Sequence, residues 1–244
     1  MWGIVPAAGG GSRIQPLAFS KELLPVGGRA DGPHERPRAV GEYIVERMIA
    51  GGATRLCFVI APGKSDIVSY FGSNVAGVPI CYVVQPRPAG LCDALFQAAP
   101  FIDRGEPVVV GLPDTIWFPV DALATVPADT LAFLLFPVDN PSLFDVVLTE
   151  PDGRVTAIQT KHAEPRGSWV WGSFKMSGPV YHALHALWQQ PDRRDEYFGP
   201  LVNAYLANGG TAVGLRTGEA YVDVGTLDGY RRAVALLGGT ERAG

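Results

Sequence analysis

Short apolar runs alternate with longer amphipathic segments through the first half of the chain. The runs span four to eight residues, as buried strands do, and glycine, proline or charged residues bound them. The segments between them carry apolar residues at helical spacing. We therefore predict strands at 2–8, 55–61, 80–85 and 107–112, with helices at 40–50, 64–71 and 91–99.

This order of elements predicts an α/β fold with a doubly wound, mostly parallel central sheet. After residue 114 the pattern changes to strand candidates joined by turn signals such as Pro151-Asp152-Gly153, which indicate a small β-rich extension. Its strands are expected at 131–138, 144–149, 154–160 and 169–176, followed by helices at 178–189 and 196–208, strands at 211–216 and 220–224, and a last helix at 226–237. The glycine-, proline- and charge-rich stretch 27–38 is interpreted as a surface loop.

Composition narrows the class of partner. The 244 residues are 47% hydrophobic and 18% charged, an ordinary balance for a globular chain. A net charge of -4 without a long basic run is not typical of a protein that binds nucleic acid or an anionic membrane. The first residues lack the pattern of a signal peptide and no apolar run is long enough to span a bilayer, so we expect a cytoplasmic protein that acts on small molecules.

Several potentially reactive residues are assigned no chemistry. Cys57, Cys81 and Cys92 are widely spaced, which fits buried thiols better than a disulfide framework or a zinc site. His182 and His185 share a predicted helix but have no third ligand nearby, so we expect them to pack. The charged run 193–197 is interpreted as exposed surface.

The strongest chemical signal follows the first predicted strand. Gly9-Gly10-Gly11-Ser12-Arg13, with Lys21 further on, combines flexible backbone N–H donors with positive charge, which suits a polyphosphate. A dinucleotide fold is disfavoured because its third glycine would fall at Ile14 and its second strand should end in an acidic residue. Gly63-Lys64-Ser65 imitates a P-loop, but its first glycine would fall at Phe58, so we interpret it as a turn that begins a helix.

The pattern Gly9-x-Gly11-Ser12-Arg13-x-x-Pro16, followed by Lys21-x-x-x-Pro25, resembles the signature of sugar-1-phosphate nucleotidyltransferases, the family of glucose-1-phosphate thymidylyltransferase and uridylyltransferase. The likeness covers nearly the whole chain, because further matches occur in the same order at 85–91, 111–114, Lys161, Gly172 and 221–226. It implies a single nucleotidyltransferase domain, 1–244, with a nucleotide-binding half at about 1–115 and a sugar-phosphate-binding half at about 116–244.

The resemblance implies a reaction between a nucleoside triphosphate, dTTP or UTP by preference, and a sugar 1-phosphate, with Mg²⁺ as cofactor. Arg13, Lys21 and Asp114 would be catalytic, and Asp114 and Asp223, each after a strand-like run, would bind the metal. Gln85 offers a donor and an acceptor that match the edge of thymine or uracil. The implied nucleotide site is Ala8, Gly9, Gly11, Ser12, Arg13, Gln85 and Gly90, and the implied sugar-phosphate site is Asp145, Lys161, Trp171 and Gly172.

Departures from the family gather at the implied sugar pocket. Asp145, Thr160 and Trp171 stand where the family often has a glycine, a glutamate and a small residue, so the sugar need not be glucose. Two alternatives stay open: a catalytically weak nucleotide-sugar-binding or regulatory protein, and a transferase for a non-sugar phosphate such as phosphocholine. The chain is expected to be a monomer or a small homo-oligomer.

Overall fold

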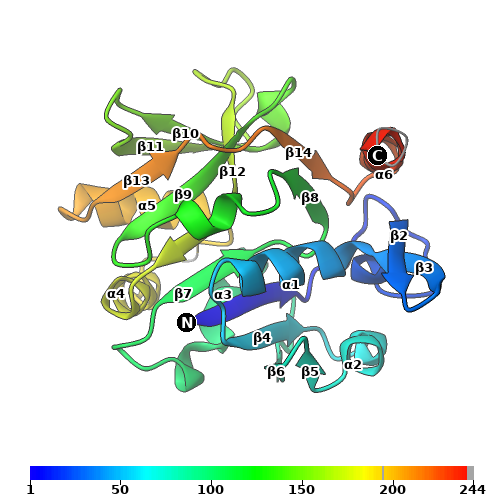
Figure 1. Cartoon of the computed structure of the whole chain (residues 1–244). Helices are drawn as coiled ribbons and strands as arrows, with labels where there is room; N and C mark the ends of the chain where they lie inside the picture. Colours follow the sequence, from blue (N-terminus) through cyan, green and yellow to red (C-terminus); the bar gives the residue numbers. More distant parts are fainter. Residues whose placement is uncertain (194, 241–244) are drawn as a thin grey trace.

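A ten-stranded sheet forms the centre of the computed structural model, which describes residues 1–193 and 195–240 (Figure 1). The helices are α1 (Val40–Ala50), α2 (Ser65–Phe71), α3 (Gly90–Gln97), α4 (Gly178–Trp188), α5 (Phe198–Ala207) and α6 (Leu227–Thr240). The strands are β1 (Trp2–Ala7), β2 (Pro25–Asp31), β3 (His34–Ala39), β4 (Arg55–Ile60), β5 (Asn74–Val75), β6 (Val78–Val84), β7 (Val108–Gly111), β8 (Thr115–Phe118), β9 (Leu131–Pro137), β10 (Asp145–Thr149), β11 (Val155–Thr160), β12 (Trp169–Met176), β13 (Ala212–Leu215) and β14 (Ala220–Asp223).

The middle of the sheet is parallel, in the order β6-β4-β1-β7. The chain winds from β1 outward through β4 and β6 and then returns to β7 on the other side of β1. In such sheets ligands bind beyond the carboxyl ends of the strands where the winding reverses. The predicted glycine loop follows β1 and the predicted Asp114 follows β7, so both lie at this switch point.

Helices cover both faces of the sheet because its strands are apolar on both sides. Along β9, Leu131, Phe133 and Leu135 pack toward α3, α4 and α5, whereas the alternate residues pack toward α1 and α2. Beyond β7 the sheet continues through the antiparallel strand β12, which pairs with β7, β9 and β10. This topology confirms the predicted α/β fold with a doubly wound central sheet, which continues into the strands of the second half of the chain.

A separate two-stranded sheet brings the two predicted metal ligands together. Strands β8 and β14 pair antiparallel, and Asp223 at the end of β14 lies opposite Thr115, the residue after Asp114. Arg47 of α1 fastens β8, because its guanidinium Nε and Nη2 donate to the Trp117 carbonyl oxygen at 3.0 and 2.6 Å. Only 2% of Arg47 is exposed, and burial lowers its pKa to about 10.

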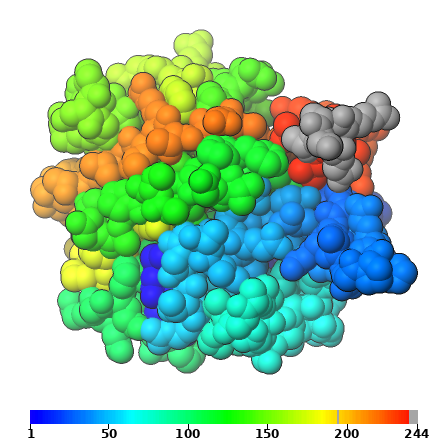
Figure 2. Space-filling view, viewed as in Figure 1, coloured from blue at the N-terminus to red at the C-terminus, as the bar shows by residue number. Residues whose placement is uncertain are grey.

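One sequence-based expectation about the backbone is wrong. The stretch 27–38 is not a loop: most of it forms the antiparallel hairpin of β2 and β3, joined by a two-residue turn at Gly32-Pro33 in which Gly32 has a φ of +58°. Both strands are polar and lack a buried apolar side, so no hydrophobic alternation marks them. Figure 2 shows the blue hairpin beside the red helix α6, which contacts β2.

Two of the residues set aside on sequence grounds, His182 and His185, pack as expected, and Cys57 and Cys92 are buried whereas Cys81 is half-buried. His182 Nε2 lies 2.8 Å from the Ile102 carbonyl oxygen, and the His185 ring stacks on Phe96. The three cysteines are free, and in the described part of the chain no three His, Cys, Asp or Glu residues form a group that could hold a metal ion. No helix among the described residues is long and apolar enough to cross a membrane.

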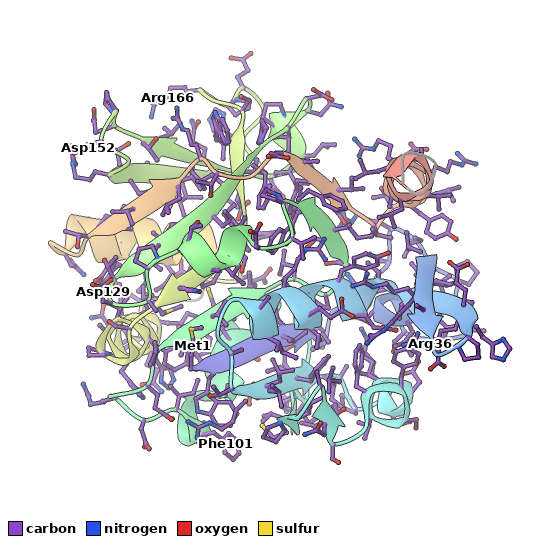
Figure 3. The ribbon with its side chains drawn as sticks, in the orientation of Figure 1. Met1, Arg36, Phe101, Asp129, Asp152 and Arg166 are labelled. Atoms are coloured by element: carbon purple, nitrogen blue, oxygen red, sulfur yellow. The ribbon has the colours of Figure 1, made fainter. Side chains whose placement is uncertain are left out.

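Replacing Arg47 by methionine is expected to lower the free energy of unfolding by about 2–4 kcal/mol, because the buried Trp117 carbonyl oxygen loses both hydrogen bonds from the guanidinium. Urea denaturation measures the change. The control is Arg166→Met at an exposed position, at the upper edge of Figure 3, where a change within about 0.5 kcal/mol is expected. Equal losses in the two variants would contradict the role given to Arg47.

Candidate active site

The glycine loop after β1 is shaped by its contact with Lys21. Gly11 has a φ of +66°, a conformation that favours glycine, and a Cβ at this position would lie 2.9 Å from Lys21 Cδ. The Gly11 carbonyl oxygen accepts a hydrogen bond from the Ile14 N–H at 3.0 Å, which closes a turn through Ser12 and Arg13. Ala8 is buried at the base of the loop, whereas Gly9, Ser12 and Arg13 are exposed.

Helix α2 holds this loop through a lysine that sequence analysis assigned to a simple turn. The turn is confirmed, since Lys64 precedes α2. Its ammonium also donates to the carbonyl oxygens of Ala7 and Gly9, both at 2.7 Å, and to both carboxylate oxygens of the buried Glu22 at 2.8 Å. Burial raises the pKa of Glu22, and Lys64 opposes that rise. Because β4 lies beside β1, its following turn reaches the glycine loop, a long-range contact that the sequence does not reveal.

The carboxylates of Asp114 and Asp223 lie side by side next to Gly225. A Cβ at Gly225 would lie 2.8 Å from Asp223 Oδ1 and 3.2 Å from Asp114 Oδ2, so the two carboxylates flank a single point. The Val224 N–H donates to the Asp114 carbonyl oxygen at 2.8 Å, and the Gly225 N–H donates to Asp223 Oδ1 at 2.7 Å. The pairing of β8 with β14 therefore fixes both side chains by their backbones.

Each of these carboxylates is paired with a predicted phosphate-binding cation. Lys21 Nζ lies 2.5 Å from Asp114 Oδ2, and Arg13 Nη2 lies 3.2 Å from Asp223 Oδ2. Burial acts to raise the pKa of Asp114, but the Lys21 ammonium outweighs it and lowers that pKa. For Lys21, burial acts to lower the pKa, and Asp114 outweighs it and raises that pKa. Both groups of the Lys21–Asp114 pair are therefore held in their charged forms.

A cavity of about 180 Å³ opens beside these pairs. Six of the predicted site residues line it, and Lys21 contacts one of these six, Asp114. Burial raises the pKa of Tyr221, and the charges of Asp223, Asp114 and Asp145 raise it further, which places this ring among all three carboxylates. The lining residues are Arg13, Leu91, Leu112, Asp114, Thr115, Leu143, Phe144, Asp145, Lys161, Trp171, Tyr197, Tyr221 and Asp223.

Tyr197 belongs to this cavity although sequence analysis gave its charged run no chemistry. The Lys161 ammonium lies 4.5 Å from the centre of the Tyr197 ring and 3.4 Å from its hydroxyl oxygen. Lys161 itself has a φ of +43°, which is uncommon for a residue other than glycine. The sequence around Tyr197 does not indicate this contact, because a single aromatic residue at the end of a charged run forms no recognisable motif. Arg194, in the same run, lies outside the described residues.

Eight predicted site residues do not line the cavity: Lys21, the glycine-loop residues Ala8, Gly9, Gly11 and Ser12, and the residues Gln85, Gly90 and Gly172. The Gln85 side-chain amide donates to the Gly90 carbonyl oxygen at 3.1 Å and to Asp93 Oδ2 at 2.7 Å. Gly90 has a φ of +85°, and a Cβ there would lie 2.6 Å from the backbone of Glu196. Gly172 is buried behind the cavity wall, where a Cβ would lie 2.6 Å from Phe136 and 2.9 Å from Tyr221.

Sequence comparison identifies the family to which this fold and site belong. A family model described as nucleotidyl transferase matches residues 2–238. The chain belongs to the nucleotidyl transferase family. Within this family, a UTP–glucose-1-phosphate uridylyltransferase of Haloferax volcanii is 29% identical over 234 residues, which are 92% of this chain and 91% of that protein. A glucose-1-phosphate thymidylyltransferase of an Actinoplanes species is 29% identical over 96% of this chain and 77% of that protein.

Solved structures agree with this assignment. A protein of Bacillus anthracis described as a glucose-1-phosphate thymidylyltransferase, solved with sucrose, superposes with a TM-score of 0.80 at 27% identity and covers 96% of this chain and 94% of that one. A UTP-bound UGPase of Acinetobacter baumannii shares the fold, with a TM-score of 0.76 at 19% identity and coverage of 96% and 92%. The resemblance to sugar-1-phosphate nucleotidyltransferases that the motifs indicated is confirmed.

Gly11→Ala is expected to lower the Tm of this nucleotidyltransferase by about 3–6 °C, because an added methyl group strains a left-handed backbone and meets Lys21. Thermal denaturation followed by circular dichroism measures the change. Gly10→Ala is the matched control, since a Cβ at Gly10 would meet nothing within 4 Å and its Tm should stay within about 1 °C. A Gly11→Ala variant as stable as Gly10→Ala would show that the loop does not need this geometry.

Proposed function

We propose that this enzyme transfers a nucleotidyl group from dTTP or UTP to a sugar 1-phosphate and releases pyrophosphate. The observation that carries the proposal is a cavity at the switch point of the sheet whose wall combines the cations Arg13 and Lys161 with the adjacent carboxylates Asp114 and Asp223. Named relatives use UTP or a thymidylyl donor with glucose 1-phosphate, which supports this reaction class. A purely binding protein would not need both carboxylates beside Lys21.

The residues beside Gly225 fit a divalent metal ion. Asp114 and Asp223 offer hard carboxylate oxygens that flank one point, and phosphate oxygens of a nucleotide would complete the ligands that Mg²⁺ prefers. The backbone pairing of β8 with β14 holds the two side chains before any ligand binds. Bound there, Mg²⁺ would neutralise charge that builds up on the phosphates.

Cations of the site would stabilise the charges that develop on the phosphates during the reaction. An acceptor phosphate oxygen attacks the α-phosphorus of the triphosphate, and the bond from that phosphorus to the bridging oxygen of pyrophosphate breaks. Lys21, next to Asp114, would stabilise charge between the α-phosphate and the attacking phosphate, and Arg13 would hold the polyphosphate near the leaving group. Lys161 would hold the acceptor phosphate. Such preorganised charge is the main source of rate enhancement in phosphoryl transfer.

We expect the base to bind near Gln85, whose side-chain amide would have to change its hydrogen-bond partners. The Gln85 amide N–H₂ group already donates to Gly90 and Asp93. Recognition of thymine or uracil would use the amide together with the backbone at Gly90, next to Leu91 on the cavity wall. This position keeps the base on the same side of the cavity as helix α3.

The proposal is tested by pyrophosphate release with each nucleoside triphosphate against a panel of sugar 1-phosphates and phosphocholine, with Mg²⁺ and then with a chelator. Release that needs Mg²⁺ and a sugar 1-phosphate is expected, fastest with dTTP or UTP. Release only with phosphocholine would favour a transferase for a non-sugar phosphate. Binding of a nucleotide sugar without any release would favour a regulatory protein.

Lys21→Ala and Asp114→Asn are each expected to lower kcat by at least about 100-fold, because each removes charge that stabilises the transition state. Steady-state kinetics of pyrophosphate release measure the loss, and circular dichroism checks the fold. Asp129→Asn is the control at an exposed position far from the cavity, at the left edge of Figure 3, and should keep turnover within about 2-fold. Near-normal turnover in Lys21→Ala or Asp114→Asn would overturn the site.

A further inference from the structure

The carboxylate of Asp145 lacks an ionic partner in its part of the cavity. Within residues 1–193 and 195–240 it forms no ion pair at 4.0 Å or less, whereas Asp114 and Asp223 are each paired. Burial raises the pKa of Asp145, and the more distant Lys161 ammonium opposes that rise. The Trp171 indole and the Lys161 backbone N–H also oppose the rise, but neither neutralises the charge. A half-buried carboxylate without a paired cation is costly, so the protein alone does not complete this end of the cavity.

Aromatic rings surround the same end. Phe144, Trp171 and Tyr221 line the cavity with Asp145, and the Phe144 and Tyr221 rings meet edge to face with centroids 5.7 Å apart. Only 6% of Trp171 is exposed, and its indole N–H acts on the Asp145 carboxylate. Aromatic faces beside a carboxylate form a surface that attracts cations.

Lys161, a predicted phosphate-binding cation of the same cavity, acts on Asp145 through its charge but forms no ion pair with it in the described part of the chain. The Lys161 ammonium rests on Tyr197, although the Lys161 backbone N–H donates to the neighbouring Phe144 carbonyl oxygen at 3.2 Å. Asp145 itself pairs across β10 and β11 with Thr160, the residue before Lys161. An acceptor whose phosphate binds Lys161 therefore has its adjacent carbon atoms close to Asp145.

Resting on the proposed function, we infer that the acceptor is a sugar 1-phosphate with a protonated amino group on the carbon next to the phosphorylated carbon, and that Asp145 binds this ammonium. A neutral sugar would bring a phosphate dianion next to an unpaired carboxylate. The ammonium removes that repulsion and forms a charge-assisted hydrogen bond, which is about twice as strong as one between neutral groups. Asp145 is thus the residue that selects the acceptor.

The test compares three acceptors that differ only at this carbon: glucosamine 1-phosphate, glucose 1-phosphate and N-acetylglucosamine 1-phosphate. Pyrophosphate release gives kcat/KM for each, and calorimetry gives each affinity without turnover. Glucosamine 1-phosphate should exceed both neutral acceptors by at least about 10-fold in kcat/KM and in affinity.

Asp145→Asn keeps the shape of the side chain and removes its charge. It should abolish the preference, so that kcat/KM for glucosamine 1-phosphate and for glucose 1-phosphate become equal within about 3-fold, and circular dichroism checks that the variant folds. Asp129→Asn, the exposed control, should keep the wild-type preference.

Equal or better use of a neutral acceptor by the wild-type enzyme would overturn the inference, and so would a preference for glucosamine 1-phosphate that survives in Asp145→Asn. These results leave the proposed transferase intact. Absence of pyrophosphate release with every sugar would instead remove the proposed function, and the calorimetric comparison would still decide whether Asp145 binds the ammonium.

Discussion

The pairing of β8 with β14 is the constraint on which the site depends. Asp114 and Asp223 are separated by more than a hundred residues in the chain, yet the register of these short strands and the hydrogen bonds donated by the Val224 and Gly225 backbone N–H groups place their carboxylates beside Gly225. Arg47 ties β8 to helix α1, which packs on the central sheet. The position of the carboxylates thus follows from backbone geometry rather than from flexible side chains, as preorganised electrostatic catalysis requires.

The charges of the site balance one another before substrates bind. Lys21 lies on Asp114 and Arg13 on Asp223, so neither the cations nor these carboxylates are left alone in a partly buried cavity. A metal ion and a polyphosphate would bind by exchanging partners: the metal takes the carboxylates and the phosphates take the cations. Asp145 has no ion pair of this kind within the described residues, which is why we propose that it recognises the acceptor rather than the metal or the polyphosphate.

The parallel core could be predicted from sequence because apolar strands are local signals, and the glycine loop and ordered motifs indicated six residues that the fold brings to one cavity. The strand β8 was missed because its partner β14 lies far along the chain, and long-range pairing leaves no local pattern. The β2–β3 hairpin was missed because its strands are mostly polar and contact helix α1 through ion pairs such as Arg29 with Glu42. Lys64 and Tyr197 were missed for the same reason as β8: their partners lie far away in the sequence and are reached only after folding.

Binding of Mn²⁺ in place of Mg²⁺ shows whether the two carboxylates that β8 and β14 bring together bind one metal ion. Water-proton relaxation reports Mn²⁺ held on the protein in the presence of UTP or dTTP. We expect one bound Mn²⁺ per chain. Asp114→Asn and Asp223→Asn should each lower the affinity for Mn²⁺ by at least about 10-fold. Wild-type affinity in either variant would contradict this expectation.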